Sequence, residues 1–297
     1  MHDVLDNVPN KTISCLDFGH VTLIDVMPRL VPDSQKTSDY AIVQAARVSY
    51  GDGTKSLNED RGLIRYLLRH KHTTPLEMIE FKFSAKLPIF IARQMIRHRT
   101  ANVNEYSGRY SLMKDEFYKP DSTNIRKQSK NNKQGSTGCI QEADAQQFMN
   151  TIDDICSKAY EEYEKAIELG VAREQARMLL PLNLYTEWYW KIDLHNLLHF
   201  LALRCDSHAQ WEIQVFGNAI LELIKPIVPL TIEAWNDYNE NRGAIKFTRL
   251  EVEALKSYFS NLQDIQVPNI NSDNKREQQE WMEKVKKIGL KVNSDIE

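Results

Sequence analysis

Apolar and polar side chains alternate from Phe81 to Leu87, and this period of two predicts a half-buried strand. Pro88 follows and begins a predicted helix, since proline is well tolerated in a helix only at its first turn. One face of this helix carries Gln94, Arg97, His98 and Ala101, and the opposite face carries Ile89, Ala92, Met95 and Ile96. The strand and the apolar stripe would anchor the helix and leave its polar face outward.

The other segments show periodicities of their own. A β-branched run predicts a strand at 21–26, and an aromatic stretch at 184–190 predicts strand or core. Predicted helices cover 39–48, 57–69, 145–169 and 194–224, and a further helix carries Arg173 and Arg177. Thr74, Pro75 and Glu77 form a capping-box pattern that would open another helix.

Two stretches are polar and predict no part of the core. We interpret 122–140, within a polar segment at 119–143, as a mobile surface insertion, because neither half of the chain beyond it needs to be independent. The tail ends in a charged helical piece around Trp281, Val285 and Ile288. The sequence therefore predicts a domain over 1–262 and a polar, partly helical extension over 263–297.

Composition and charge exclude several classes of protein. The 297-residue chain has a net charge of −3, so no global positive field would recruit a polyanion. The N-terminus lacks the pattern of an export signal, and no apolar run approaches the length of a membrane span. The four cysteines lie far apart, which favours reduced thiols. We expect a cytoplasmic protein that does not bind a membrane.

The segment from Arg97 to Tyr110 has the chemistry of an anion pocket. Arg97, His98 and Arg99 are followed by an acid, a hydroxyl, a glycine and another arginine. Guanidinium groups suit phosphate, and a Ser-Gly turn lets backbone N–H groups approach an anion closely. The sequence predicts a pocket for a phosphorylated small molecule. The alternative is a surface helix end with cations near its C-terminus.

Arg204 follows three apolar residues and is predicted to lie on a largely buried helix. A buried guanidinium needs a partner, because an unpaired buried charge costs several kcal/mol. One interpretation is an internal ion pair with Asp206 or a glutamate elsewhere. The other is that Arg204 faces an anionic or ionisable ligand.

Metal binding and nucleophilic catalysis are less well supported. His195 and His199 are four residues apart, but Asn196 stands where a zincin helix carries glutamate, and no cysteine completes a zinc site. Ser107 lacks a nucleophile-elbow pattern, and Cys205 is predicted to be buried and inert. We therefore predict no metal and no enzyme nucleophile.

Nucleic-acid binding by the basic segment 97–109 is a competing interpretation. It would need a basic face that extends over many phosphates. The cations here are few and are mixed with acidic residues such as Glu105, which favours a compact pocket.

Five segments, in order along the chain, resemble the flavin-dependent thymidylate synthases. One is Arg-His-Arg, seven further residues and then Ser-Gly-Arg-Tyr, which spans Arg97 to Tyr110. The others are 70–77, 92–94, 179–185 and 203–212. The resemblance covers about residues 20–235.

The resemblance implies reductive methylation of dUMP to dTMP, with methylenetetrahydrofolate as carbon donor, FAD as hydride carrier and NADPH as reductant. It also implies a single α+β domain, with a twisted antiparallel sheet packed against long helices, and a homotetramer whose active sites are shared between subunits. An alternative enzyme is a flavin- and folate-dependent methyltransferase that acts on uridine in RNA. It would require a wide basic approach surface.

The resemblance also implies residue roles. Arg204 is the catalytic residue, because a guanidinium beside uracil N3 and a carbonyl stabilises the ionised ring. The substrate-binding residues besides Arg204 are Gln94, Met95, Ile96, Arg97, Glu105, Tyr106, Ser107, Gly108, Arg109 and Arg177. Gln94 and Arg97 would come from one subunit and 105–109 from another. The FAD-binding residues are Thr74, Arg97, His98, Arg99, Glu105, Asp193, Leu194, His195 and His199.

The chain departs from the family pattern at Asp193, His195 and His199, where other members often carry Asn, Arg and Asn. We expect flavin binding to persist there through different hydrogen bonds.

Overall fold

The computed structural model describes residues 1–48, 57–130, 135–239, 244–259, 267 and 270–290. They belong to two compact units, Met1–Arg242 and Gly243–Glu297, which are taken separately below. The boundary predicted from the sequence lies after residue 262, and that division into domains stays a prediction. None of the helices in the described ranges is both long and apolar enough to cross a membrane.

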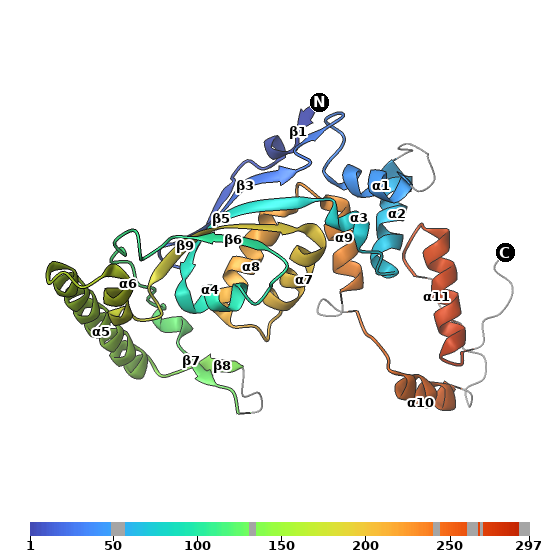
Figure 1. Cartoon of the computed structure of the whole chain (residues 1–297). Coiled ribbons are helices and arrows are strands. Elements are labelled where there is room, and N and C mark those ends of the chain that lie inside the picture. The colour runs from blue at the N-terminus through green and yellow to red at the C-terminus, as the bar shows by residue number, and fades with distance from the viewer. Residues whose placement is uncertain (49–56, 131–134, 240–243, 260–266, 268–269, 291–297) are drawn as a thin grey trace. The chain divides into compact units, whose positions relative to one another are not determined.

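The first unit is built on a five-stranded antiparallel sheet (Figure 1). Its strands, in spatial order, are β2 (Thr12–Cys15), β3 (Gly19–Met27), β5 (Glu80–Pro88), β9 (Tyr185–Asp193) and β6 (Asn102–Glu105). The strands predicted at 21–26, 81–87 and 184–190 are confirmed. The antiparallel sheet and the helices that cover it confirm the α+β class.

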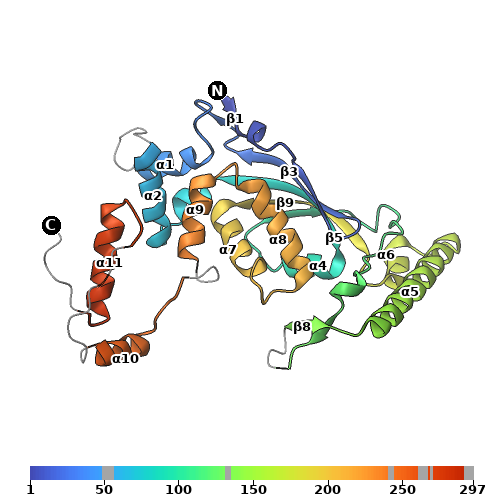
Figure 2. The same cartoon turned by 180° about the vertical axis from the view of Figure 1, so that it is seen from behind.

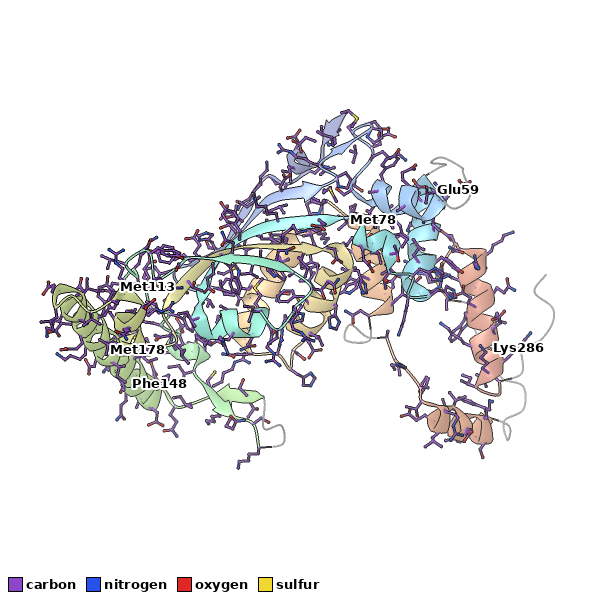
Figure 3. All side chains as sticks on the ribbon, viewed as in Figure 1. Glu59, Met78, Met113, Phe148, Met178 and Lys286 are labelled. Carbon is purple, nitrogen blue, oxygen red and sulfur yellow. The ribbon has the colours of Figure 1, made fainter. Side chains whose placement is uncertain are left out.

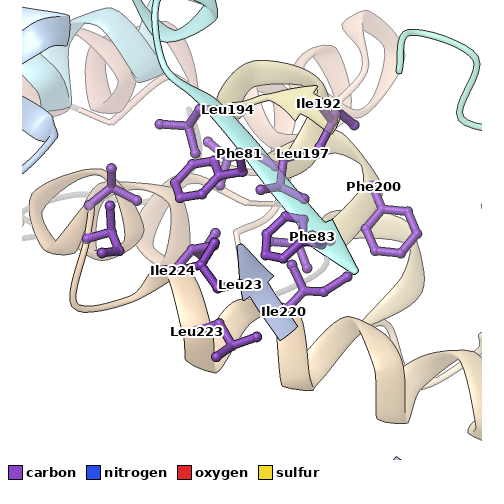
Figure 4. Close-up of a cluster of buried hydrophobic side chains, with 14 of the residues drawn as sticks. Leu23, Phe81, Phe83, Ile192, Leu194, Leu197, Phe200, Ile220, Leu223 and Ile224 are labelled. Atoms are coloured by element: carbon purple, nitrogen blue, oxygen red, sulfur yellow. The ribbon is translucent and has the colours of Figure 1, made fainter. Parts of the chain in front are cut away.

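The main core lies between one face of the sheet and two helices, α7 (Leu194–Arg204) and α8 (Trp211–Ile224). Figures 1 and 2 show these helices against the same face from opposite sides. The predicted alternation explains this packing, since all four apolar members of 81–87 are buried. Figure 4 shows Phe81 and Phe83 of β5 beside Leu197, Phe200, Ile220, Leu223 and Ile224 of the two helices.

A second apolar cluster packs around α5 (Glu142–Glu168) and α6 (Arg173–Ala176). The buried Tyr163 hydroxyl accepts a hydrogen bond from the Met113 backbone N–H at 3.1 Å. Figure 3 labels Met113, Met178 and Phe148 at this end of the unit. A 3-10 turn at Arg177–Leu179 follows α6. The helix predicted at 145–169 is confirmed. The helix predicted to carry Arg173 and Arg177 is confirmed at Arg173 only, since α6 ends at Ala176.

The polar segment at 119–143 contains more structure than the sequence predicted. Its described residues form a 3-10 turn at Ser122–Asn124 and a hairpin of β7 (Arg126–Gln128) and β8 (Ser136–Cys139). Local bonds stabilise this part, because the Asp121 carboxylate accepts from the Thr123 backbone and hydroxyl at 2.8 and 2.6 Å. Residues 131–134 of the predicted insertion lie outside the described residues.

Helices α1 (Asp39–Arg47), α2 (Leu57–Arg69), α3 (Thr74–Glu77) and α9 (Pro229–Tyr238) pack at the other end of the unit. The buried Asp39 carboxylate accepts hydrogen bonds from the backbone N–H groups of Leu230 and Thr231, which joins α1 to the start of α9. Two short strands, β1 (His2–Asp3) and β4 (Leu30–Val31), pair beside a 3-10 turn at Val4–Asn7. The helices predicted at 39–48 and 57–69 are confirmed.

Three predicted helix boundaries are wrong. The helix predicted at 194–224 is broken at 205–210, where Asp206 Oδ1 accepts from the His208 backbone N–H at 2.8 Å and so competes with helical bonding. Helix α4 (Ile89–Met95) ends before Arg97, since the chain must turn to bring β6 beside β9. The capping box at Thr74 is absent: α3 begins at Thr74, and the preceding Thr73 makes no side-chain cap.

The second unit contains α10 (Arg249–Phe259) and α11 (Lys275–Lys287). Asn274 caps α11, with its side-chain oxygen accepting from the backbone N–H groups of Arg276 and Glu277. The helical piece predicted around Trp281 and Val285 is confirmed, and Ile288 is its C-cap.

Candidate active site

Arg204 ends α7 and reaches the turn that follows α4. Its Nε donates to Nε2 of His98 at 3.2 Å, and its terminal nitrogen donates to the backbone carbonyl of Gln94 at 3.4 Å. The side chain is half-buried, and burial lowers the pKa of Arg204 from its usual value. Both acceptors are neutral, so neither compensates the positive charge.

The predicted alternative, an internal ion pair of Arg204, is wrong for the described residues. No carboxylate among them lies within ion-pair distance of its guanidinium. Asp206 instead turns to His208, whose Nδ1 lies 2.7 Å from Asp206 Oδ1. A half-buried, uncompensated guanidinium is therefore available to a ligand.

His98 is held in its neutral form. Burial lowers the pKa of His98 to about 4, and the charges of Arg204 and His199 act in the same direction. Its ring lies edge-on to Phe200 with centroids 4.9 Å apart, and 5.8 Å from the ring of His199. Because the ring is neutral at neutral pH, Nε2 can accept from Arg204 instead of repelling it.

Gln94 extends this group of side chains toward the start of α8. Its Nε2 donates to Oε1 of Gln210 at 2.5 Å. Gln210 Nε2 in turn donates to Oε2 of Glu212 at 2.8 Å. Gln210 and Glu212 lie in segment 203–212, which resembles the family, but the resemblance implied no role for either residue. Their link to Gln94 spans more than 100 residues of sequence, so no local pattern could have predicted it.

Arg97 and Arg99 flank His98 on the exposed turn before β6. Neither side chain makes a hydrogen bond or ion pair with any residue in the described ranges. Two guanidinium groups are thus open to an anion beside the half-buried Arg204. Of the neighbouring predicted residues, the Met95 side chain is buried in the main core, whereas Ile96 is exposed.

The second part of segment 97–110 forms a separate group after β6. The Arg109 backbone N–H donates to the Ser107 hydroxyl at 3.3 Å, and Arg109 Nε lies 3.1 Å from the Glu174 carboxylate. Arg177 Nε donates to the Glu174 backbone carbonyl at 3.3 Å. Gly108 lies close to two side chains, because a Cβ on it would lie 2.9 Å from Met113 Sδ and 3.3 Å from Arg177 Cδ, and one of them would have to shift.

Strand β6 separates the two groups within one chain. Asn102 pairs with Lys191 and Glu105 pairs with Trp188, so Arg97–Arg99 and Ser107–Arg109 lie at opposite ends of this strand. Its length is roughly 10 Å at about 3.4 Å per residue. Glu105 is oriented by the Thr186 hydroxyl, which donates to its Oε1 at 2.7 Å. Tyr106, the next residue, donates its hydroxyl to the Leu112 carbonyl at 2.6 Å.

The predicted flavin segment lies at the N-terminus of α7. Asp193 caps this helix, with Oδ1 accepting from the Asn196 backbone N–H at 2.9 Å, and Leu194 is buried. His195 is half-buried and His199 is exposed. Thr74 is exposed at the start of α3, which contacts α7. No group of three metal-ligating side chains occurs in the part of the chain that the structure describes.

Comparisons with known proteins point to one family. Residues 29–230 match the Thy1 family, described as thymidylate synthase complementing protein. A flavin-dependent thymidylate synthase of Dictyostelium discoideum is 50% identical over 285 residues, which cover 96% of this chain and 90% of that protein. A flavin-dependent thymidylate synthase of Wolbachia pipientis wMel is 52% identical over 248 residues, 84% of each chain.

A solved structure shares the fold. The crystal structure of the UMP/dUMP methylase PolB from Streptomyces cacaoi, bound with 5-Br dUMP, superimposes with a TM-score of 0.67 and 33% identity. It covers 76% of this chain and 98% of its own. The family match spans β5, β6, β9 and α7, the elements that carry the candidate site. This chain belongs to the family of flavin-dependent thymidylate synthases.

Proposed function

We propose that this protein methylates dUMP reductively to dTMP, with methylenetetrahydrofolate as carbon donor and NADPH as reductant. The observation that carries the proposal is the half-buried Arg204, which has only neutral partners among the described residues. A uracil ring that loses its N3 proton would supply the missing negative charge. The relatives named above as flavin-dependent thymidylate synthases support the same reaction.

Arg204 acts on the pyrimidine ring. Its planar guanidinium donates to uracil N3 and an adjacent carbonyl, which stabilises negative charge on the ring and raises electron density at C5. C5 can then attack the one-carbon unit without a covalent bond to the enzyme. The bond between this carbon and the folate nitrogen breaks, C5 loses its proton, and the folate leaves as tetrahydrofolate. Two of the four thiols are poor nucleophiles, because burial raises the pKa of Cys15 to about 12 and also raises the pKa of Cys156. Cys205 is half-buried, so the prediction that it is buried is wrong.

The residues present fit FAD. Arg97 and Arg99 are exposed guanidinium groups without partners among the described residues, and a diphosphate would give both of them one. His98, His199, Thr74 and Glu105 would complete the site, together with Asp193, Leu194 and His195 at the start of α7. Once reduced by NADPH, the bound FAD would supply the hydride that converts the transferred carbon to a methyl group. Neutral His98 would hold Arg204 toward the pyrimidine by accepting a hydrogen bond from its Nε.

The group after β6 would bind the 5′-phosphate of the nucleotide. The site would contain the Ser107 hydroxyl, the backbone N–H of Gly108, and the guanidinium groups of Arg109 and Arg177. Arg109 forms an ion pair with Glu174 in the structure. Because this pair is exposed and therefore weak, a phosphate could take the place of the Glu174 carboxylate.

The protein would act as a homotetramer with active sites shared between subunits. Within one chain, β6 keeps the predicted phosphate-binding residues 107–109 away from Arg204 and Gln94. A second subunit that presents its residues 105–109 to the first subunit's Gln94 and Arg97 would bring both ends of one nucleotide site together. The edge position of β6 leaves this segment accessible for such a contact.

UMP is a second candidate substrate. The solved methylase is described as acting on both UMP and dUMP, and a second structure of it is bound with 5-Br UMP. The two nucleotides differ only at the 2′ position of the sugar.

The test is a product assay with purified protein, FAD, NADPH and methylenetetrahydrofolate. Separate reactions contain dUMP or UMP, and the methylated nucleotide is measured. The proposal predicts dTMP that requires every component. Absence of dTMP in the complete mixture would refute it, and methylated UMP without dTMP would establish the second candidate instead.

A further inference from the structure

A chain of hydrogen bonds joins a core tyrosine to the side chain beside Arg204. Glu212, in the first turn of α8, accepts from the buried Tyr118 hydroxyl at 3.3 Å through Oε1. Its Oε2 accepts from Gln210 Nε2 at 2.8 Å. Gln210 Oε1 accepts from Gln94 Nε2 at 2.5 Å, and the Gln94 backbone carbonyl accepts from Arg204.

The donors and acceptors in this chain have a fixed order. A carboxylate can only accept, so Gln210 must turn Nε2 toward Glu212 and its oxygen toward Gln94. Gln94 must therefore donate to Gln210 through Nε2. Tyr118 cannot reverse the order, because burial and then the charge of Glu212 raise the pKa of Tyr118 and keep its hydroxyl protonated.

The order determines what Gln94 offers to a ligand. Its Oε1 makes no hydrogen bond with any residue that the structure describes, and one N–H of its amide also remains. Without an external constraint, a glutamine amide can rotate by half a turn and exchange its donor and acceptor at little cost. Glu212 prevents this rotation of the Gln94 amide indirectly, through its hydrogen bond with Gln210.

We propose that Glu212 is a positioning residue that sets the hydrogen-bonding sense of Gln94 toward the bound nucleotide. The inference rests on the proposed function, in which Gln94 contacts dUMP. Glu212 itself does not touch substrate, and its effect passes through Gln210. If the Gln94 amide rotated by half a turn, Nε2 would face the nucleotide where Oε1 should accept. A hydrogen bond to the nucleotide would then be lost and its donor left unsatisfied.

The first test is Glu212→Gln, which keeps the shape of the side chain but allows it to donate or accept. The dissociation constant for dUMP is measured by calorimetry on the FAD-loaded protein. We expect it to rise about five-fold, the value of one neutral hydrogen bond, with little change in kcat at saturating dUMP. The matched control is Glu222→Gln, which removes the same charge from an exposed position on the same helix and should bind dUMP as the wild type does.

A double variant separates hydrogen-bond order from charge and packing. In Gln210→Glu with Glu212→Gln, residue 210 becomes the acceptor and Gln94 must again donate. We expect dUMP affinity to return to within about two-fold of the wild type. Loss of affinity that the double variant does not reverse would overturn the proposal. Gln210→Ala, at an exposed residue, breaks the chain without changing charge and carries the test if Glu212→Gln does not fold.

The outcomes distinguish this inference from the proposed function. If the wild type fails to bind dUMP, the proposed function fails. If the wild type binds dUMP and Glu212→Gln and Gln210→Ala bind it equally well, only the positioning role of Glu212 is refuted.

Discussion

Nε of Arg204 donates to Nε2 of His98 at 3.2 Å, so a cation is held by an imidazole and not by a carboxylate. A carboxylate would neutralise the guanidinium and weaken its attraction for an ionised pyrimidine. A neutral imidazole fixes the direction of the side chain and leaves its charge available. This relationship depends on His98 remaining unprotonated, which its burial ensures at neutral pH.

The His98 ring makes folding stability depend on pH. Its pKa is about 4 in the folded protein and about 6.5 in an unfolded chain, so the unfolded state binds the proton more readily. The free energy of unfolding therefore falls as pH drops from about 6.5 toward 4. The free energy of unfolding is measured by urea titration at pH 4.5 and at pH 7.5. Allowing for the partial exposure of His98, we expect His98→Asn to reduce the difference between these two free energies by about 2 kcal/mol. A variant that keeps the wild-type difference in the free energy of unfolding between these two pH values would contradict this role of His98.

Arg109 should affect nucleotide binding only through the phosphate. Arg109→Ala is expected to weaken dUMP binding about ten-fold, because it removes a charge-assisted contact, and to leave deoxyuridine binding unchanged. The two dissociation constants are measured by calorimetry, with the exposed Arg126→Ala as a charge-matched control. Equal losses for nucleotide and nucleoside would place Arg109 outside the phosphate site.

Gly217 permits α8 to approach Arg204. A Cβ on Gly217 would lie 3.0 Å from Cys205 Sγ and 3.4 Å from the backbone carbonyl of Arg204. Gly217→Ala should therefore displace the end of α7 and lower kcat about ten-fold, although alanine favours the helix itself. Adding Cys205→Ala removes the closest contact and should restore most of the rate. A single variant with wild-type kcat would show that this approach does not position Arg204.

Asp39 contributes to the stability of the first unit. Its buried carboxylate accepts from Leu230 N–H at 2.8 Å and from the Thr231 hydroxyl and N–H at 2.5 and 3.2 Å. Asp39→Ala leaves these donors buried and unpaired, and we expect a loss of about 3 kcal/mol in urea unfolding at pH 7.5. Asp33→Ala, at an exposed residue, is the control. A loss below about 1 kcal/mol would contradict a structural role for this contact.

Features with a local cause could be predicted from the sequence. The alternation at 81–87 predicted β5 and the face that it buries, because the pleat alone determines which side chains point to the core. Arg204 could be predicted as a site residue because apolar neighbours in the sequence indicate burial, and a buried guanidinium needs a partner.

Features with a distant cause could not be predicted. The turn at Asp206 looked helical, because apolar residues continue on both sides and the competing side-chain bond leaves no periodicity. The end of α4 depends on the pairing of β6 with β9. The link from Gln94 to Glu212 joins the ends of two helices that only the folded sheet brings together.

The most direct test of this account compares dTMP formation by the wild type and Arg204→Lys, each loaded with FAD and supplied with dUMP, NADPH and methylenetetrahydrofolate. Lysine keeps the charge but loses the planar pair of donors. We predict that the wild type forms dTMP and that the variant retains its flavin absorbance but forms dTMP at least about 100-fold more slowly. A variant that forms dTMP at the wild-type rate would contradict the role of Arg204 on which the mechanism depends.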